Sequence, residues 1–314
     1  MSEIYISVII PVYDRQLLAE RALGSAVTQN VSGMEIVVVD DCSSPPFRLP
    51  DNLTGHPDIV LTRLKSNQGE AEARNAGVAA ARGQWIAFLD TDDYWLPGTL
   101  APRLSAAAKS FAQSKDVLTV YVGGFVMDNT RLGRREARMP VASDDPEMFA
   151  SGCWFCPGST SLLRRDVFTK VGPFDGALRR LEDLDWYLRL ALCGGRVAVW
   201  DEIVAVVRAG RKSAIGTLET AIDHLQGKYA SPGPLQLAPT LFRKLCAYFD
   251  IERAAIAADK KNWLRTAFFI SRSFARVPRL TLHLEDFWRR CPVGGKLATR
   301  AFGADTTRRG ARPG

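Results

Sequence analysis

Several features that would place this 314-residue chain in a common class are missing from its sequence. No apolar run approaches the roughly 18 residues that a membrane-spanning helix needs. The first ten residues, MSEIYISVII, carry neither a basic leader nor a small-residue cleavage site, so they predict a first strand and not a signal peptide. Neither Gly-X-Gly-X-X-Gly nor Gly-X-X-X-X-Gly-Lys-Ser/Thr occurs, which disfavours a dinucleotide site and a Walker phosphate loop.

A disulfide framework is also missing. The six cysteines follow no framework spacing, which favours a reduced, cytoplasmic setting. Cys153-Trp154-Phe155-Cys156 matches Cys-X-X-Cys, yet no second pair or nearby histidine completes a zinc site. A redox or metal role for these two cysteines is therefore the minor hypothesis.

The net charge of +7 is concentrated at one end of the chain. Residues 243–314 hold 16 Lys and Arg against 6 Asp and Glu, a balance of +10, so residues 1–242 carry −3. A basic segment of this kind favours an anionic surface as its partner, either membrane lipid or nucleic acid.

The stretch Trp85–Trp95 runs five apolar or small residues directly into the carboxylates Asp90, Asp92 and Asp93. Such an apolar run is typical of a central strand covered on both faces. Carboxylates just past its end fall in the crevice where open α/β sheets bind ligands, and their hard oxygens suit Mg²⁺ or Mn²⁺. The alternative is an acidic helix start, because these residues could cap a helix that opens at Pro97.

Strand and helix patterns alternate through the first 95 residues, which predicts an α/β fold with a parallel, doubly wound sheet. With 46% apolar residues, the chain can bury one such core and still have length for an appendage. The predicted strands are 4–12, 35–41, 58–64 and 85–89, and the predicted helices between them are 15–29 and 70–81.

Polar side chains follow these strands at Asp14, Asp40, Asp41, Asn67 and Asp90 to Asp93. Because the carboxyl ends of parallel strands meet at one edge of a sheet, we expect these residues to lie together. A nucleotide fits this arrangement, since carboxylates accept hydrogen bonds from ribose hydroxyls or a base imide while a metal screens the phosphates.

The stretch 181–191 is predicted to be a helix with Leu181, Leu184, Leu188 and Ala191 on one face. Glu182 and Asp183 lie in its first turn, where acids are ordinary helix-start residues. The functional hypothesis is a general base delivered to the rim of the pocket. Asp185 lies beside the apolar face and is expected to be a structural partner.

The middle of the chain predicts a helix over 97–114, a strand over 117–127 and a mobile polar segment over 128–145. The aromatic segment Phe149–Gly158 is either the lining of an acceptor pocket or a hydrophobic loop packed under the sheet. Short closing strands are expected at 196–200 and 203–207.

Strand patterns stop near Gly216, and helices are expected at 218–229, 241–258, 263–274 and 280–290. In the third helix, apolar residues alternate with Arg265, Arg272 and Arg276, a pattern that fits a membrane surface or the solvated face of a bundle. The predicted organisation is a catalytic domain over 1–215, a helical region over 216–302 and a disordered tail over 303–314.

These segments together resemble the family 2 glycosyltransferases, inverting enzymes of GT-A fold that use nucleotide-activated sugars. The resemblance runs from Ile6 to Val207. It is carried by SVIIPVYD at 7–14, EIVVVDD at 35–41, Asn67-Gln68-Gly69 with ARNAG at 73–77, FLDTDD at 88–93, and Glu182-Asp183. The family commonly has Asp-Asp-Gly-Ser in the second loop, where this chain has Asp40-Asp41-Cys42-Ser43.

The resemblance implies a role for each matching residue. Pro11, Tyr13, Asp14 and Asp40 look like the nucleoside pocket, with Asp40 toward the base and Tyr13 beside its ring. Asn67, Gly69 and Arg74 resemble the segment that reaches the nucleotide. Asp90-Thr91-Asp92 looks like the Asp-X-Asp motif, with Asp90 toward the ribose and Asp92 holding Mn²⁺ or Mg²⁺ on the diphosphate. Asp183 resembles the catalytic base.

The implied function is transfer of a sugar from a nucleotide-sugar donor to a glycan or lipid-linked acceptor, in cell-surface polysaccharide synthesis. The implied location is cytoplasmic, with the alternative that the basic helices hold the protein on the cytoplasmic face of the inner membrane. A nucleotidyltransferase and a non-catalytic sugar-binding protein of the same fold are the rival hypotheses. Nucleic-acid binding is disfavoured, because the aromatic residues of the basic region follow a packing pattern and form no stacking platform.

Overall fold

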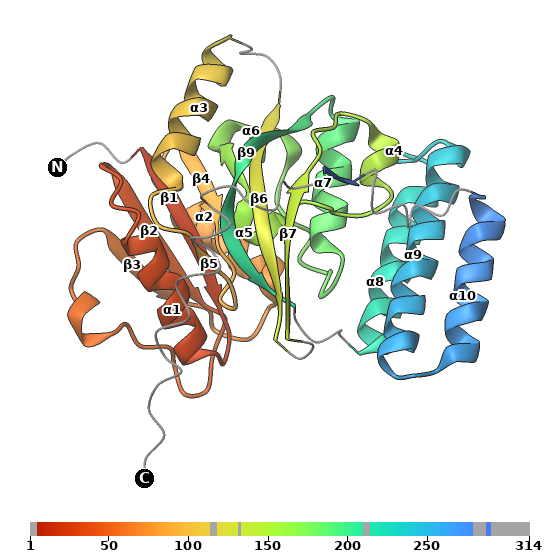
Figure 1. Ribbon diagram of the computed structural model, residues 1–314, viewed down its shortest axis with the longest axis horizontal. Helices are drawn as coiled ribbons and strands as arrows, with labels where there is room; N and C mark the ends of the chain where they lie inside the picture. The colour runs from red at the N-terminus through yellow and green to blue at the C-terminus, as the bar shows by residue number, and fades with distance from the viewer. Residues whose placement is uncertain (1–4, 114–117, 131–132, 210–213, 279–286, 290–314) are drawn as a thin grey trace.

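The computed structural model describes residues 5–113, 118–130, 133–209, 214–278 and 287–289. One sheet runs through the middle of the molecule, and three C-terminal helices stand side by side beyond its edge (Figure 1). The strands are β1 (Ile6–Val12), β2 (Met34–Asp40), β3 (Ile59–Arg63), β4 (Trp85–Phe88), β5 (Tyr94–Trp95), β6 (Thr119–Asn129), β7 (Arg134–Pro140), β8 (Leu162–Arg164), β9 (Arg196–Arg208) and β10 (Trp288–Arg289). The helices are α1 (Gln16–Val27), α2 (Glu70–Ala80), α3 (Leu100–Gln113), α4 (Pro146–Phe149), α5 (Pro157–Thr160), α6 (Arg165–Val171), α7 (Glu182–Leu192), α8 (Ile215–Ala230), α9 (Pro239–Asp259) and α10 (Trp263–Arg276), with a 3-10 turn η1 at Asp51–Leu53.

The sheet has a parallel half and a mixed half. Its order is β10-β7-β6-β8-β4-β1-β2-β3, and β9 pairs with both β5 and β6. Strands β3, β2, β1 and β4 are mutually parallel, as the alternation of strand and helix predicts. Their carboxyl ends therefore meet at one edge.

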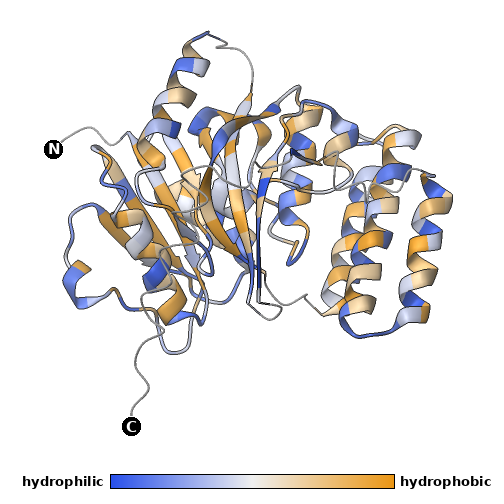
Figure 2. Ribbon diagram, viewed as in Figure 1, coloured by the Kyte–Doolittle hydropathy of each residue, from blue (hydrophilic) through white to orange (hydrophobic). Residues whose placement is uncertain are grey.

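Apolar residues cover both faces of the parallel half, which explains its unbroken hydrophobic runs. Along β1, Ile9 packs in the core on the face that α2 and α7 cover, while Val8 and Ile10 pack on the face of α1 and α3. The hydropathy colouring shows apolar strands in the centre of the molecule (Figure 2). The polar residues Ser7 of β1 and Glu35 of β2 bond to each other near the amino ends of the strands, and Asp40 lies at the carboxyl end of β2, at the ligand edge.

The second half of the sheet differs from the sequence prediction in three places. Residues 128–145, expected to be mobile, contain β7, which pairs antiparallel with β6. Its residues 134–138 include three Arg and one Glu, a polar composition that is typical of a loop, so the sequence did not indicate a strand. The two closing strands are one continuous strand, β9, which runs parallel to β6 with a register shift at Gly123 and Gly124. The strand β5 was not predicted.

The C-terminal helices α8, α9 and α10 confirm three of the four helices expected there. The fourth, at 280–290, lies largely outside the described residues, and its end contradicts the prediction because Trp288–Arg289 forms a strand antiparallel to β7. The predicted tail over 303–314 lies outside the described residues. Within the described part of the chain, no helix is both long and apolar enough to span a bilayer.

Two of the three arginines of α10 face the neighbouring helix α9. Arg272 bonds to Asp250 on α9, and Arg276 Nε lies 3.1 Å from the second oxygen of the same carboxylate. The outer face is apolar, with Trp263, Leu264 and Phe268 between 58% and 87% exposed. The three arginines that suggested a basic membrane-facing stripe therefore differ in position: Arg265 is exposed, and Arg272 and Arg276 are half-buried against α9.

Candidate active site

A cavity of about 600 Å³ opens at the carboxyl ends of β1, β2 and β4. One wall, the strand side, consists of residues in or just after these strands, among them Pro11, Tyr13, Asp41 and Asp90 to Asp92. The opposite wall, the helix side, consists of Arg179, Arg180, Glu182 and Asp183 at the entry to α7. Asn67, Gly69, Glu70, Ala73 and Arg74 complete the lining between them.

Nine of the eleven residues assigned to the site from the sequence line this cavity. They are Pro11, Tyr13, Asn67, Gly69, Arg74, Asp90, Thr91, Asp92 and Asp183. Asp14 and Asp40 are not among the lining residues. Asp14 instead borders a neighbouring hollow of about 470 Å³ with Arg15, Gln16 and residues 43–48.

Arg74 connects the two walls of the cavity. Its guanidinium donates to Asp90 Oδ1 on the strand side at 2.8 Å and to Asp183 Oδ1 on the helix side at 3.0 Å. Glu70 Oε1 lies 2.5 Å away and Glu182 Oε1 lies 3.8 Å away. The side chain is only 2% exposed, so one buried cation serves four carboxylates. The site therefore holds an excess of negative charge that protons or further cations must offset.

The pKa of Asp183 is raised in these surroundings. Burial raises its pKa to about 7, opposed by the Arg74 cation and assisted by the negative charges of Glu182 and Asp90. The carboxyl is still 25% exposed to the cavity. A carboxylate with a pKa near neutrality that faces a cavity is suited to accept a proton.

The short helix α5, which contains Gly158 and Ser159, fixes the acidic segment. Asp90 N donates to Ser159 Oγ at 3.2 Å, and the same hydroxyl bonds to the buried Asp93. Asp93 also accepts from Arg208 N at 2.9 Å, which ties the segment to β9. Gly158 leaves no room for a side chain, since a Cβ there would lie 1.9 Å from Asp90 Oδ2. The position of Asp90 thus depends on a glycine and a serine 68 and 69 residues further along the chain.

Asp92 is the residue on the strand side best suited to a divalent cation. Its carboxylate lines the cavity, is 25% exposed and accepts from Arg15 Nη1 at 2.7 Å. Burial and then the charge of Asp90 raise its pKa, while Arg15 lowers it. Among the described residues no three His, Cys, Asp or Glu side chains form a metal cage. A cation shared with a diphosphate does not need one, because Mg²⁺ is commonly held by one or two carboxylates and substrate phosphates. The donor set fits such a cation.

Of the two acids at the end of β2, Asp41 lines the cavity and Asp40 does not. Asp40 is buried and accepts from Ser43 N at 2.8 Å, from Phe47 N at 3.2 Å and from Arg63. Burial works to raise its pKa, but these hydrogen bonds outweigh burial and lower it. Asp41 lines the cavity and accepts from the backbone amides of Gln68 and Gly69 at 2.7 and 2.8 Å. The role of Asp40 toward a base stays a prediction, and the carboxylate on the cavity wall is Asp41.

Arg179 and Arg180 line the helix side and were not singled out from the sequence. Arg179 Nη1 donates to Asn67 Oδ1 at 2.7 Å and lies over Gly69. Arg180 Nη2 donates to Glu252 of α9 at 2.8 Å. Their position just before Glu182-Asp183 could have indicated them, because residues that lead into a helix lie close to the side chains of its first turn.

The aromatic segment Phe149–Gly158 packs as core. Phe149, Trp154 and Phe155 are at most 3% exposed, and their rings contact one another at centroid distances of 5.0 to 6.5 Å. This supports the packed-loop alternative over an acceptor lining. Burial raises the pKa of the Cys153 and Cys156 thiols well above the ordinary value, which makes both poor nucleophiles.

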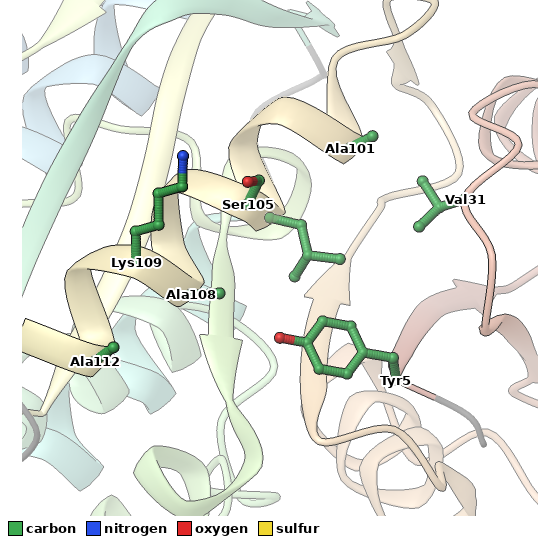
Figure 3. A pocket seen from close by; sticks show the side chains of 8 residues that line it. Tyr5, Val31, Ala101, Ser105, Ala108, Lys109 and Ala112 are labelled. Atoms are coloured by element: carbon green, nitrogen blue, oxygen red, sulfur yellow. The ribbon is translucent and has the colours of Figure 1, made fainter.

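A second groove, of about 510 Å³, lies between α3 and the start of β1 (Figure 3). Among the described residues, its lining consists mainly of small or apolar side chains, including Ala101, Ala108 and Ala112, with Lys109 as the one charged residue. These lining residues do not include the convergent polar groups of a catalytic site.

Comparison with known proteins agrees with this geometry. The model of the family described as Glycosyl transferase family 2 matches residues 7–172, more than half of the chain. The chain is 32% identical over 200 residues to the succinoglycan biosynthesis protein ExoO of Rhizobium meliloti, covering 62% of this chain and 58% of that protein. It is 27% identical over 189 residues to an uncharacterized glycosyltransferase of Haemophilus influenzae, covering 59% and 61%. The chain thus matches about three fifths of the length of these relatives.

Solved structures share the architecture. The crystal structure of S. aureus TarS 1–349 in complex with UDP-GlcNAc has a TM-score of 0.52 and 20% identity, covering 86% of this chain and 73% of that one. At that identity the likeness shows the fold alone, which is the GT-A type of α/β fold with C-terminal helices. With more than half of its length matched by the family model, the chain belongs to the family 2 glycosyltransferases.

Proposed function

We propose that this protein is an inverting, hexosyltransferase-like enzyme that moves a sugar from a nucleotide-diphospho-sugar to a hydroxyl of a glycan or lipid-linked acceptor. The observation that carries the proposal is the pair of ion contacts from Arg74 to Asp90 and to Asp183 across one cavity. Those contacts bring the Asp-X-Asp segment and a carboxylate of near-neutral pKa within reach of one bound molecule.

In this proposal the strand side takes the nucleotide and the helix side takes the acceptor. Asp183 accepts the proton of the acceptor hydroxyl as that oxygen attacks the anomeric carbon, and the bond to the nucleoside diphosphate breaks in the same displacement. Arg74 holds Asp183 oriented toward the cavity while it balances Asp90. A carboxylate that accepts a proton loses its charge, so the excess negative charge around Arg74 favours this step.

Asp92 is the residue that would hold Mn²⁺ or Mg²⁺ together with the diphosphate oxygens. When bound, the cation would stabilise the negative charge on the departing diphosphate. Arg15 then has the role of holding the Asp92 carboxylate at the cavity wall at 2.7 Å.

The place of the reaction in metabolism is proposed from the relatives. ExoO of Rhizobium meliloti is described as a succinoglycan biosynthesis protein. That description supports synthesis of a cell-surface polysaccharide as the process served by this chain. The UDP-GlcNAc complex of TarS supports a nucleotide sugar as the donor.

The direct experiment is a screen of UDP-, GDP- and dTDP-sugars for release of the nucleoside diphosphate, with Mn²⁺, with Mg²⁺ and with EDTA. We expect one donor to turn over with metal, and EDTA to stop turnover reversibly. Full activity in EDTA would contradict the metal role. Tight nucleotide binding without release, with glycan acceptors supplied, would favour the non-catalytic alternative, and formation of a nucleotide sugar from a sugar phosphate would favour a nucleotidyltransferase.

We also propose that the outer face of α10 rests on an anionic membrane surface. Its exposed Trp263, Leu264 and Phe268 form an apolar strip, and Lys260, Lys261 and Arg265 lie exposed at the same end of the helix. Apolar side chains with cations beside them suit insertion at a headgroup layer, and the balance of +10 over residues 243–314 suits anionic lipid.

Sedimentation with liposomes tests the membrane proposal. Wild-type protein should bind phosphatidylserine vesicles at low salt, and Leu264→Glu with Phe268→Glu should remove most of that binding. Leu17→Glu is the matched control, since Leu17 is also highly exposed, at 79%, but lies on α1, outside the apolar strip of α10. Equal sedimentation of wild type and the α10 variant would overturn the proposal, as would a stable dimer in solution that the α10 variant dissociates.

A further inference from the structure

One lysine of the C-terminal helices bridges the two ends of the segment that carries the helix side of the cavity. We call residues 175–185 the entry segment, because it leads into α7 and contains Arg179, Arg180, Glu182 and Asp183. Lys228 of α8 places its Nζ 2.8 Å from Asp175 Oδ2 and 2.7 Å from Asp185 Oδ1. The first and last residues of the entry segment are therefore joined through a single ammonium group.

Asp185 is held from several directions. Its carboxylate is 0% exposed and also accepts from Arg189 Nε at 2.9 Å and from Tyr229 Oη of α8 at 2.9 Å. Arg189 in turn donates to the carbonyls of Val171 and Pro173. A buried carboxylate with this many partners has one allowed position, so it fixes the first turn of α7 two residues after Asp183.

Asp175 is held at the other end of the entry segment by Lys228 and His224. Burial works to raise its pKa, but hydrogen bonds from Lys228 and His224 outweigh burial and lower the pKa to about 2. The His224 contact is 2.9 Å. Asp175 therefore stays ionised, and its attachment to α8 persists through the physiological range of pH.

The middle of the entry segment is tied to α9. Arg180 Nη2 donates to Glu252 at 2.8 Å, and Tyr248 Oη donates to the other oxygen of Glu252 at 2.7 Å. Directly after Arg180, Leu181 adopts φ 64°, in the left-handed region that disfavours a branched side chain. A residue keeps such a conformation only where its surroundings hold it, and these contacts lie on both sides of Leu181.

We propose that Lys228 is a positioning residue for catalysis: it acts through Asp175 and Asp185 to hold the entry segment so that Asp183 faces the cavity. The helices α8 and α9 are on this account part of the machinery of the transferase and not only an appendage. The proposal rests on the proposed function, because it assumes that Asp183 acts on the acceptor.

The test compares Lys228→Met with Lys228→Arg in the full chain. Met keeps the length of the side chain and removes the charge, so Asp175 and Asp185 lose their common partner. We expect kcat to fall about 10- to 100-fold, the range for small misplacement of a reacting group, while the dissociation constants of UDP and GDP change less than about twofold. Lys228→Arg should recover much of kcat, because it restores a cation to both carboxylates.

Hydrogen exchange of the ligand-free protein gives a second readout. Lys228→Met should speed exchange of the amides over 175–185 and leave those over 67–74 unchanged. Lys244→Met is the matched control: Lys244 also lies on a C-terminal helix, but its partner Glu147 is outside the entry segment. That variant should change neither exchange over 175–185 nor kcat. If Lys228→Met loses solubility, Asp175→Asn replaces it, because that substitution breaks only one end of the bridge. The same changes in kcat and in hydrogen exchange over 175–185 are expected.

Three results would overturn the proposal. They are unchanged exchange over 175–185 in Lys228→Met, unchanged kcat, or a fall in nucleotide affinity equal to the fall in kcat. A wild-type protein without turnover on any donor would contradict the proposed function alone, and the exchange comparison would still decide whether Lys228 holds the entry segment.

Discussion

The two walls of the cavity are built in different ways. On the strand side, Pro11, Asp41 and Asp90 lie in or directly after β1, β2 and β4, and parallel backbone ladders fix the strands that carry them. On the helix side, Glu182 and Asp183 begin a helix whose entry is held by Arg74, Lys228 and Glu252, which come from α2, α8 and α9. Backbone pairing supports one wall, and ion pairs between distant side chains support the other.

The difference predicts how each wall fails. A substitution on the strand side removes a ligand group from a frame that stays in place, so it should weaken nucleotide or metal binding. A substitution on the helix side should leave nucleotide binding intact and impair the chemical step. Arg74 belongs to both walls, since it contacts Asp90 and Asp183 at once.

The largest effect is expected on the helix side, from Asp183→Asn. The amide keeps the size of the side chain but cannot accept the acceptor's proton, so kcat should fall about 10²–10⁴-fold while nucleotide affinity stays nearly unchanged. Steady-state kinetics and calorimetric titration of the nucleoside diphosphate measure the two quantities.

Glu182→Gln is the matched control for Asp183→Asn. Glu182 lies next to Asp183, but its carboxylate is 3.8 Å from Arg74, against 3.0 Å for Asp183. It should keep most of kcat. Loss of kcat in Glu182→Gln with normal activity in Asp183→Asn would move the base by one residue.

On the strand side, Asp92→Ala should lower turnover by about 10²-fold or more, because the diphosphate loses the carboxylate that shares its cation. Addition of Mn²⁺ should tighten nucleoside diphosphate binding to wild type and not to the variant. Arg15→Ala is the control, since it removes the partner of Asp92 and keeps the carboxylate. Equal metal dependence in Asp92→Ala and wild type would exclude Asp92 as the ligand.

The acids at the strand ends were predictable because the end of a buried strand is a local feature of the sequence. Asp90 to Asp92 follow β4 and Asn67 follows β3, and the parallel order β4-β1-β2-β3 brings them to one edge. The choice between Asp40 and Asp41 was not predictable. It depends on which carboxylate the loop amides of Ser43 and Phe47 capture, and that is set by the folded loop.

Long-range partners left no signal in the sequence. Lys228 and Glu252 have the pattern of ordinary polar residues on amphipathic helices. Only folding places Lys228 beside Asp175, 53 positions earlier, and Glu252 beside Arg180, 72 positions earlier. Asp185 is the exception, because its place beside the apolar face of the helix predicts burial with a partner. The structure confirms that with Lys228, Arg189 and Tyr229.

A smaller effect should follow from Gly158→Ala, because the added methyl group displaces the Asp90 carboxylate on the strand side. The new methyl group would meet the Asp90 carboxylate at 1.9 Å, so that carboxylate must shift. We expect nucleotide affinity to fall about tenfold, as for modest misplacement of a binding group. Gly227→Ala on α8 meets no atom within 4 Å and should have no effect. Unchanged affinity in Gly158→Ala would show that the position of Asp90 does not matter for the donor.

The pH dependence of kcat/KM, which reports the pKa values of the free enzyme, tests the central claim most directly when wild type is compared with Asp183→Asn. A general base works only when it is unprotonated, so activity should be full above the pKa of Asp183, about 7, and should fall about tenfold for each pH unit below it. Asp183→Asn should lose that acidic limb and keep a low, flat rate. An unchanged acidic limb in Asp183→Asn would contradict the account, because the group that titrates would then lie elsewhere.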